Sequence, residues 1–383
     1  MSHPLGGTPT IGLFDSSGTA HSGNALRGLV RAAAEFGLST TVYAHPSVIP
    51  APPRPDLTWN DVEGPSQTNE PESRRRHREL LIAAMTDFGP GPGRVFCDLG
   101  LDRTLGSRGP AIPADAHVVF VGHRVGALDR RPVRWHRRFN RNRSSNRAVL
   151  RQLGTAGARF VVHTEPVGAR FADFVPADHV TRLGWPVASR HEPTLGPGWR
   201  PDVSDRMVLL AGSVRLEKGY EQFLRAAHEL SGYDRLVVMG RVPKLLQDAF
   251  RDADPRVDFW DRWLTEDEYH QAFSTAALVA VPYVEHYAKF GTMSSVLLDA
   301  LAHGRPALVA EPLAYLLPSD YAGAVVTDAT DEAALSRGLA SALADLDRLE
   351  AAAMGDGRRF IAEHHTYEAY LVGLARAGGI EIA

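Results

Sequence analysis

The fold is decided most clearly by the stretch Pro282-Tyr-Val-Glu-His-Tyr-Ala-Lys-Phe-Gly-Thr-Met-Ser-Ser-Val-Leu-Leu-Asp-Ala-Leu-Ala-His-Gly-Arg-Pro306. The apolar run 278–281 just before it predicts a buried strand, and its leucines predict a helix that begins near Ser294. Gly304 is typical of a residue that ends a helix. A strand, a loop and a helix in this order predict a β/α unit whose loop lies at the carboxyl end of a sheet, where open α/β sheets bind ligands.

The start of this predicted helix carries side chains suited to an anion. Thr292, Ser294 and Ser295 have hydroxyls that can cap the helix, and the neighbouring amides can meet a ligand at its positive end. Asp299 follows within the first turns, and a carboxylate, which only accepts hydrogen bonds, suits the paired hydroxyls of a ribose. The alternative role of Asp299 is an interaction with the helix dipole, worth about 0.3–1 kcal/mol at an exposed site.

A second glycine turn lies earlier in the chain, in Ala211-Gly-Ser-Val-Arg-Leu-Glu-Lys-Gly-Tyr220. It follows the predicted strand 207–211 and precedes the predicted helix 220–230. The glycines let backbone amides approach a ligand, and Arg215 and Lys218 add two cations suited to a diphosphate. A solvated turn with ordinary surface charges is the alternative.

Outward from these motifs, strands and helices alternate along almost the whole chain, which predicts parallel sheets covered by helices on both faces. The other predicted strands are 9–14, 40–44, 94–97, 117–121, 159–163, 236–239 and 257–260. A proline-rich segment predicts a linker, and 46–70 is predicted to be a long surface loop. We therefore expect an N-terminal domain over 1–185, a linker over 186–204, a C-terminal domain over 205–362 and a last helix within 363–383 that packs back towards the first domain.

The composition excludes several classes of protein. The chain has 383 residues, enough for two domains of ordinary size. Its 42 basic and 45 acidic residues give a net charge of −3, which offers no overall case for nucleic-acid binding. The single cysteine, Cys97, excludes an intramolecular disulfide and a multi-cysteine metal site, and its apolar neighbours predict burial. We see no signal peptide or membrane-spanning run, so we expect a cytoplasmic protein.

Together these motifs resemble the donor-binding domain of the GT-B glycosyltransferases, in particular the large retaining class known as family four. That class commonly has a glycine, a basic residue and Lys-Gly after the first strand of its C-terminal domain, as at Gly212, Arg215 and Lys218-Gly219 here. Its later signature ends in an acidic residue followed by Ala-Leu-Ala-x-Gly-x-Pro, which matches 299–306 here. The resemblance implies an α/β fold of two Rossmann-like β/α/β domains that face each other across a cleft.

The same resemblance implies roles for individual residues. Arg215 and Lys218 would neutralise the diphosphate leaving group, and Asp299 would hold the nucleotide ribose. The family's scheme requires no metal ion and no cofactor, because the nucleotide-sugar is a substrate, and the sequence shows no convincing metal-binding cluster. The resemblance covers the C-terminal domain strongly and the N-terminal domain only in general plan.

The sequence departs from the family's pattern at two positions. The family signature has two glutamates separated by seven residues, but Gly291 occupies the first position and Asp299 the second. Ser213 stands where many relatives carry an arginine, which leaves Arg215 as the substitute. The first glutamate usually faces the donor sugar, so sugar identity and stereochemical outcome stay open. Glu285 or His286 in the preceding loop could fill that space, and a solvated loop is the alternative.

The N-terminal domain is expected to bind the acceptor. The turn after its first strand carries Gly18, His21 and Gly23, whose glycines could admit the donor or the acceptor. An ordinary turn between a strand and a helix is the alternative.

Two histidines follow later strands of the same domain. His123 comes after the strand 117–121 and could accept a proton from an acceptor hydroxyl or hydrogen-bond the sugar. His163 is a second candidate of the same kind, and a structural histidine is the alternative for both. The candidate catalytic residues are therefore His123 and Glu285.

A strongly basic segment lies between these histidines. A solvated helix and loop, an anionic acceptor site and a surface resting weakly on anionic lipid are the three interpretations, in that order. Its arginines are Arg130, Arg131, Arg134, Arg137, Arg138, Arg141, Arg143 and Arg147. In the C-terminal domain, Arg241 and Arg262 are the residues expected near the nucleobase.

The primary hypothesis is a glycosyltransferase of the hexosyltransferase type that moves a sugar from a nucleotide-sugar to a hydroxyl-type acceptor, with the retention that the family's mechanism implies. The acceptor would be a small molecule, a saccharide or a lipid-linked compound, and no nucleic acid is expected. One alternative is a phosphorylase-like or pseudo-glycosidic transferase on the same scaffold. The other is a nucleotide-sugar-binding protein in which the missing glutamate reflects lost catalysis.

Overall fold

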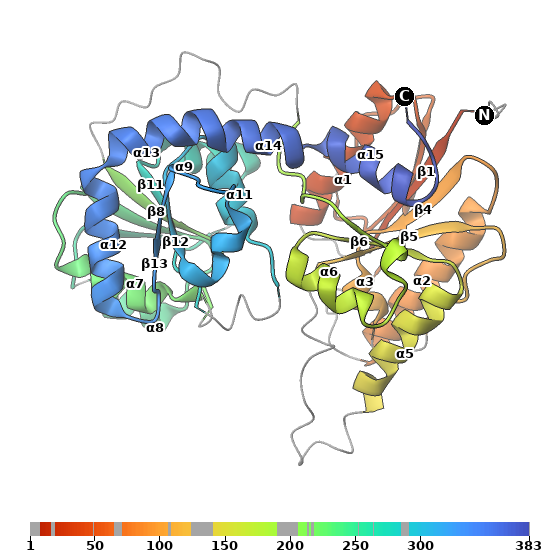
Figure 1. The fold of residues 1–383 in the computed structure, drawn as a ribbon, viewed down its shortest axis with the longest axis horizontal. Helices are drawn as coiled ribbons and strands as arrows, with labels where there is room; N and C mark the ends of the chain where they lie inside the picture. The colour runs from red at the N-terminus through yellow and green to blue at the C-terminus, as the bar shows by residue number, and fades with distance from the viewer. Residues whose placement is uncertain are drawn as a thin grey trace. The chain divides into compact units, whose positions relative to one another are not determined.

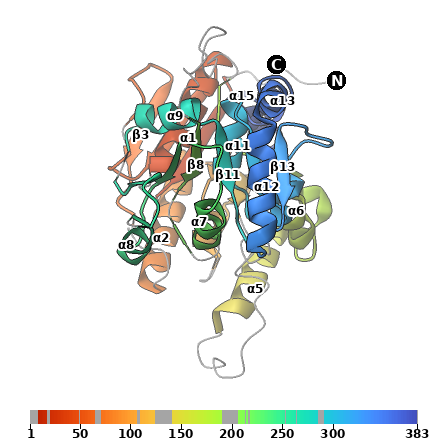
Figure 2. The same ribbon diagram turned by 90° about the vertical axis from the view of Figure 1, so that its left-hand side faces the viewer.

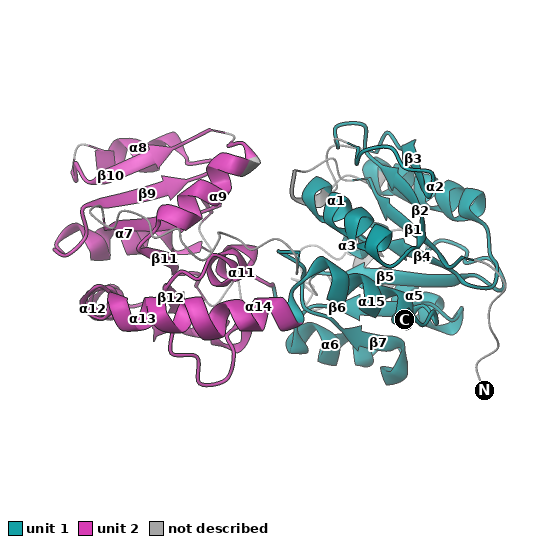
Figure 3. Cartoon of the chain, turned by 90° about the horizontal axis from the view of Figure 1, so that it is seen from above, with its two compact units in different colours: residues 1–189, 290–292, 364–383 teal, residues 190–289, 293–363 magenta. Residues whose placement is uncertain are grey.

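A computed structural model describes residues 8–16, 20–48, 50–64, 71–105, 109–123, 141–189, 206–212, 214–215, 218–251, 253–262, 264–284 and 291–382. The chain divides into two compact units (Figure 3). Unit 1 comprises Met1–Ser189, Phe290–Thr292 and His364–Ala383, and unit 2 comprises Arg190–Lys289 and Met293–Glu363. Residues 186–189 of the expected linker thus fall in unit 1, and 190–204 lie outside the described residues, with 205.

Unit 1 is built on a parallel sheet of seven strands in the order β3-β2-β1-β4-β5-β6-β7 (Figure 1). The strands are β1 (Thr10–Asp15), β2 (Ser39–Ala44), β3 (Leu57–Asp61), β4 (Arg94–Asp98), β5 (His117–Gly122), β6 (Arg159–Val162) and β7 (Val180–Arg182). The chain leaves β1 towards β2 and β3 and then returns to place β4 on the other side of β1. That reversal between β1 and β4 is the switch point at which such sheets bind ligands.

Helices cover both faces of this sheet because its central strands are apolar on both sides. Residues such as Leu13, Cys97 and Val119 pack against α1 (Ala20–Glu35) and α15 (Tyr367–Ala377). Residues such as Phe14 and Phe120 pack on the other face, against α2 (Pro71–Phe88), α3 (Leu101–Thr104), α5 (Arg141–Thr155) and α6 (Glu165–Ala172). The last long helix, α15, therefore lies beside α1 on the same face of the sheet of unit 1.

Unit 2 repeats the plan with six parallel strands in the order β10-β9-β8-β11-β12-β13 (Figures 1 and 2). The strands are β8 (Met207–Ala211), β9 (Arg235–Met239), β10 (Val257–Trp260), β11 (Leu278–Val281), β12 (Ala307–Ala310) and β13 (Ala324–Thr327). Its longer helices are α7 (Tyr220–His228), α8 (Lys244–Arg251), α9 (Glu266–Thr275), α11 (Ser295–Ala302), α12 (Glu332–Ala344), α13 (Leu346–Ala352) and α14 (Arg358–His364). The two parallel β/α units expected from the sequence are confirmed.

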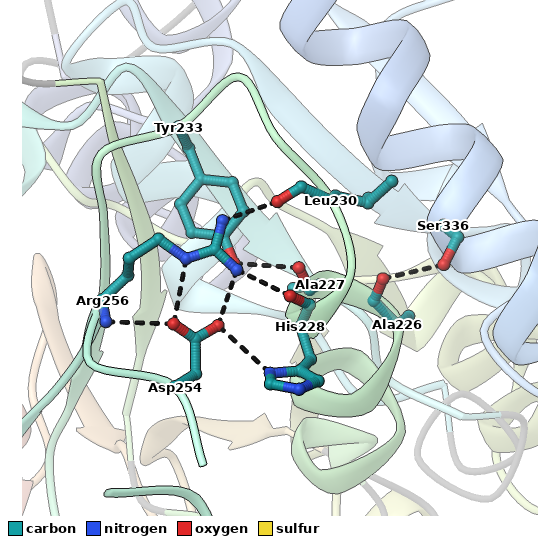
Figure 4. A network of polar contacts seen from close by, with 8 residues as sticks. All are labelled: Ala226, Ala227, His228, Leu230, Tyr233, Asp254, Arg256 and Ser336. Atoms are coloured by element: carbon teal, nitrogen blue, oxygen red, sulfur yellow. Dashed lines mark hydrogen bonds and ion pairs between the residues drawn. The ribbon is translucent and has the colours of Figure 1, made fainter. Parts of the chain in front are cut away.

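A polar cluster fixes the turn between α7 and β9 in unit 2 (Figure 4). Asp254 accepts hydrogen bonds from Arg256, whose guanidinium lies 4.4 Å from the centroid of the Tyr233 ring. Burial raises the pKa of Tyr233 to about 12, and its hydroxyl donates to the carbonyl of Ala227 at 2.9 Å. This cluster is structural, since its donors and acceptors bond to one another and to main-chain carbonyls.

The expected surface loop 46–70 is corrected at one place, because β3 lies within it and pairs with β2. The segment Leu57-Thr-Trp-Asn-Asp61 has only two apolar residues, and none of the five is fully buried, so no clear period marks it as a strand. Its pairing with β2, a tertiary contact, makes it an edge strand. Cys97 is buried as expected, and burial raises the pKa of its thiol. Among the helices in the described part of the chain, none is long and apolar enough to cross a membrane.

Candidate functional site

The loops that carry the two predicted motifs leave the sheet of unit 2 at neighbouring positions. Strands β8 and β11 pair side by side, and the strand order reverses between them. The loops touch, because a Cβ atom at Gly219 would collide with the carbonyl oxygen of Pro282, and Gly219 has a φ of 63°. Only glycine meets both conditions without strain. The switch point of unit 2 therefore brings the glycine turn and the segment before α11 together.

Lys218 is a buried cation at the switch point of unit 2, with 6% of its surface exposed. Its ammonium lies 4.8 Å from the centroid of the Tyr283 ring, which follows β11. A Cβ atom at Gly212 would lie 2.8 Å from the same ammonium, and Gly212 has a φ of 94°. A buried lysine needs anionic or aromatic neighbours to keep its charge, and the Tyr283 face supplies part of that stabilisation.

Arg215 lies in the same turn, and its side chain is exposed. Its carbonyl accepts from the amide of Lys218 at 2.9 Å, while the amide of Val214 donates to the carbonyl of Arg241 at 2.9 Å. The structure therefore brings Arg215 and Arg241 to one edge of the turn. Arg262 follows β10, which pairs with β9, and its two terminal nitrogens bond to Glu268 at 2.8 and 2.9 Å.

The helix α11 begins at the expected position. Ser294 is its N-cap residue, 1% exposed, and its hydroxyl oxygen accepts from the amide of Leu297 at 3.3 Å. The hydroxyl of Ser294 is thus engaged in capping, whereas Thr292 and Ser295 are half-buried. Gly304 follows the helix with a φ of 62°, as expected for a helix-ending glycine.

Asp299 is half-buried on α11 and is held by a tyrosine from another helix. Its Oδ2 accepts from the hydroxyl of Tyr269, on α9, at 2.7 Å. Burial raises the pKa of Asp299 to about 7, and the Tyr269 hydrogen bond opposes that rise by stabilising the carboxylate. A carboxylate next to a tyrosine hydroxyl offers several acceptors to a ligand that donates hydrogen bonds. The sequence did not identify Tyr269, because nothing local links residue 269 to residue 299.

Gly291 stands where the family pattern has its first glutamate, and it is grouped with unit 1. Its φ of 64° is left-handed, and a Cβ atom there would lie 2.9 Å from a methyl group of Val167. The hydroxyl of Thr164 donates to the Gly291 carbonyl at 2.8 Å. A glutamate therefore does not fit this backbone without a shift.

The two histidines predicted in unit 1 lie together at the carboxyl ends of β5 and β6. The rings of His123 and His163 have centroids 5.0 Å apart, and each ring lies 5.0 Å from that of Trp185. His123 Nε2 donates to the carbonyl of Leu99 at 2.9 Å. His163 Nδ1 donates to the carbonyl of Leu183, and burial lowers the pKa of His163 well below its usual value.

A buried polar chain in unit 1 was missed by the sequence analysis. Ser16 Oγ lies 2.7 Å from His77 Nδ1, His77 Nε2 lies 3.1 Å from Thr104 Oγ1, and Thr104 donates to Asp98 Oδ2 at 2.9 Å. All four side chains are buried; Ser16 directly follows β1, and Asp98 ends the paired strand β4, at the switch point of unit 1. Their places at strand ends were the available signal, but His77 stands among charged residues in Ser73-Arg-Arg-Arg-His-Arg78, a sequence typical of a solvated helix.

The hydrogen bonds of this polar chain all run in one direction, from Ser16 to Asp98. Because Thr104 gives its proton to Asp98, the Nε2–H of His77 donates to Thr104, and Ser16 donates to Nδ1. Burial lowers the pKa of His77 to about 4 and raises the pKa of Asp98 to about 7. A neutral histidine thus links Ser16 to an aspartate at the carboxyl edge of the sheet.

Several predicted residues lie outside the described residues: Gly18, Glu285, His286 and the arginines from 130 to 138, together with the side chains of His21, Arg141 and Arg143. Gly23 is buried in α1, where a Cβ atom would lie 3.3 Å from Val48. Arg147 is exposed and lies 5.5 Å from the centroid of the Phe174 ring. Among the residues that the structure describes, no group of three or more His, Cys, Asp or Glu side chains could hold a metal ion.

Residues 205–345 match the family described as glycosyl transferases group 1. The match covers both loops at the switch point of unit 2, and there the resemblance to a group 1 glycosyltransferase is confirmed. A comparison with curated protein sequences gave no match.

Solved structures with the same fold are glycosyltransferases and related enzymes. A sucrose-phosphate synthase from Thermosynechococcus elongatus has a TM-score of 0.68 at 14% identity, over 96% of this chain and 98% of that chain. WaaG, a glycosyltransferase involved in lipopolysaccharide biosynthesis, has a TM-score of 0.66 at 14% identity, with the same shares of the two chains. Anabaena HepE in complex with UDP and glucose has a TM-score of 0.58 at 12% identity, over 96% and 97%. The chain has the GT-B fold, and the family match supports a glycosyltransferase.

Proposed function

We propose that this protein transfers a sugar from a nucleotide-sugar to a hydroxyl-type acceptor, with retention of the anomeric configuration. The observation that carries the proposal is the buried ammonium of Lys218, which lies at the switch point of unit 2 between Gly212 and the Tyr283 ring. Asp299, held by Tyr269, follows on the helix that starts at the same place. One cation for a diphosphate and one carboxylate for a ribose are the two groups that a nucleotide-sugar donor requires.

In the proposed reaction the bond between the anomeric carbon and the diphosphate oxygen breaks, and the acceptor oxygen bonds to that carbon. The departing diphosphate takes up negative charge, which Lys218 and Arg215 stabilise. The acceptor proton passes to an oxygen of the leaving phosphate, which lies on the same face of the sugar in a retaining reaction. His123, whose Nε2 donates to the carbonyl of Leu99, would hydrogen-bond a sugar hydroxyl through its other ring nitrogen. The acceptor class, a hexose as the transferred sugar, metal independence and a cytoplasmic location remain predictions.

A catalytically inactive nucleotide-sugar-binding protein is the second candidate, and Gly291 favours it. The backbone at Gly291 leaves no room for the acid that the family pattern has there, because a Cβ atom would lie 2.9 Å from Val167. A protein that kept the donor site and lost the sugar-facing acid would bind the donor without turnover.

The test is incubation of the purified protein with UDP-, GDP- and ADP-linked hexoses, with and without simple saccharide acceptors, while the released nucleoside diphosphate is measured. Release that depends on an acceptor supports the enzyme, and NMR of the product then reports whether the anomeric configuration is retained. Binding without release for every pair supports the binding protein. Failure to bind any of these donors contradicts both candidates.

A further inference from the structure

The hydrogen bond between Tyr269 and Asp299 joins two helices whose residues lie far apart in the sequence. Tyr269 has one hydroxyl proton, and its hydroxyl donates that proton in the 2.7 Å hydrogen bond to Oδ2 of the carboxylate. The bond leaves lone pairs on Tyr269 Oη and on Asp299 Oδ1, two oxygens that can accept hydrogen bonds from a ligand. A pair of acceptors held in one place is complementary to a pair of neighbouring hydroxyls.

The helix that carries Tyr269 is fixed at its start. Thr265 and Glu268 form a capping box, in which the Thr265 side chain accepts from the amide of Glu268 and the Glu268 side chain accepts from the amide of Thr265. Arg262 holds the same glutamate with two hydrogen bonds. These contacts fix the start of α9, and Tyr269 lies one turn after Thr265, with its amide bonded to the Thr265 carbonyl at 3.0 Å.

A second polar contact ties α9 to the end of α11. Ser274 gives its proton to the carbonyl of His270, so the Nδ1–H of His303 donates to Ser274, and His270 donates to Nε2 of His303. Burial lowers the pKa of His303 to about 3, which agrees with this neutral form. The amide of His303 in turn bonds to the carbonyl of Asp299 at 2.9 Å. Asp299 is thus held by its side chain and by its main chain.

We propose that Tyr269 and Asp299 together bind the 2′- and 3′-hydroxyls of the donor ribose, with Asp299 Oδ1 accepting from one hydroxyl and Tyr269 Oη from the other. This assignment rests on the proposed function, because it concerns the ribose of the same donor. It makes Tyr269 a ribose-binding residue that also orients the carboxylate. The base and the sugar of the donor play no part in it.

The affinity for nucleotide should then depend on pH in a way that Tyr269 controls. The pKa of Asp299 is raised to about 7 by burial, so the carboxylate loses charge as the pH falls through that value. Tyr269 on α9 bonds to Asp299, and Tyr220 on α7 acts on Tyr269 only through its electrostatic field. Removal of the Tyr269 hydroxyl takes away a hydrogen bond that stabilises the charged form, so the pKa of Asp299 should rise further.

The test is calorimetric titration of the full chain with UDP, GDP and ADP, followed by the 2′-deoxy and 3′-deoxy forms of the nucleotide that binds. Tyr269→Phe should weaken binding of the ribonucleotide about ten-fold, the effect of losing a hydrogen bond to a charged or polar site. One of the two deoxy nucleotides lacks the hydroxyl that Tyr269 would bind. Tyr269→Phe and the wild type should therefore bind that nucleotide with nearly the same affinity. The midpoint of the pH-dependent affinity loss should also move upward in Tyr269→Phe.

Tyr233→Phe is the matched control, because Tyr233 is a buried tyrosine of the same unit whose hydroxyl bonds to a main-chain carbonyl (Figure 4). It should bind all nucleotides as the wild type does. The assignment would be overturned if Tyr269→Phe bound the ribonucleotide as tightly as the wild type does. It would also be overturned if removal of a ribose hydroxyl weakened binding to the variant as much as to the wild type. Either result would leave the proposed function standing. A wild-type protein that binds none of the three nucleoside diphosphates would overturn both.

Discussion

The ammonium of Lys218 lies 4.8 Å from the centroid of the Tyr283 ring, at the point where the strand order of unit 2 reverses. Lys218 follows β8 and Tyr283 follows β11, so the contact joins the two loops that meet at the carboxyl end of this sheet. The aromatic face stabilises a cation that is otherwise removed from water. It holds the ammonium where a diphosphate would approach the glycine turn.

Lys218→Ala should therefore lower the affinity for a nucleoside diphosphate by about 10- to 100-fold, since hydrogen bonds to charged groups contribute about 1.5–3 kcal/mol. Lys244→Ala is the control, because Lys244 is an exposed lysine at the start of α8 in the same unit. Titration calorimetry and thermal unfolding of both variants separate binding from stability. Wild-type affinity in folded Lys218→Ala would remove this residue from the donor site.

The aromatic partner can be tested separately. Tyr283→Leu keeps an apolar side chain at a buried position but removes the ring face beside Lys218. The variant should retain its fold and bind nucleoside diphosphate about two- to thirty-fold more weakly, because the cation–π contact contributes about 0.5–2 kcal/mol. In a double variant with Lys218→Ala, the Tyr283→Leu substitution should cost little more, and additive losses would show that the two residues act independently.

Gly291 gives a test of why the family's acid is missing. Gly291→Ala should lower the free energy of unfolding by more than Gly37→Ala, although both glycines have a φ near 64°. The difference arises because a Cβ atom at Gly37 meets nothing within 4 Å, whereas at Gly291 it would lie 2.9 Å from Val167. We expect about 1 kcal/mol for Gly37→Ala and about 1–3 kcal/mol more for Gly291→Ala. Urea unfolding measures both, and equal losses would refute the steric explanation.

The polar chain of unit 1 predicts a pH dependence of stability. The pKa of Asp98 is raised to about 7 by burial, so its contribution to stability is fully present below about pH 4 and is lost as the pH rises through 7. The pKa of His77 is lowered to about 4, so its contribution is present above about pH 6.5 and is lost as the pH falls towards 4. Between about pH 4 and 6.5, a rise in pH lowers the contribution of Asp98 to stability and raises the contribution of His77.

Asp98→Asn should therefore leave the histidine effect unopposed. The free energy of unfolding should fall more steeply with acidification in this variant than in the wild type, by about 1.4 kcal/mol per pH unit between pH 4.5 and 6.5. Urea unfolding at several pH values measures the slope, and Asp178→Asn, an exposed aspartate of the same unit, is the control. A slope equal to that of the wild type would mean that Asp98 is charged throughout this range.

Sequence patterns were sufficient for the central strands and for the two loops at the switch point of unit 2. Strands such as β8 and β11 are apolar on both faces and stand out in any short window, and Gly212, Gly219 and Gly304 mark turns that need left-handed backbone. The edge strand β3 was missed because its pairing with β2 compensates for a half-polar sequence.

The missing parts of the site share another cause, which is that they depend on contacts between distant residues. Tyr269 approaches Asp299 only after α9 and α11 pack, and His77 reaches Ser16 and Thr104 only after α2 covers the sheet. No local period records such contacts. Gly291 was recognised as a departure from the family pattern, but the reason for it, the nearby methyl group of Val167, is a tertiary feature.

The most direct test of the donor site is a crystal structure of the protein with a bound nucleoside diphosphate. We expect a diphosphate oxygen within hydrogen-bond distance of Lys218 Nζ, about 2.7–3.2 Å, and ribose hydroxyls at the same distance from Asp299. A nucleotide that is bound elsewhere on the chain, with Lys218 and Asp299 both outside its contacts, would show that the donor site does not lie at the switch point of unit 2.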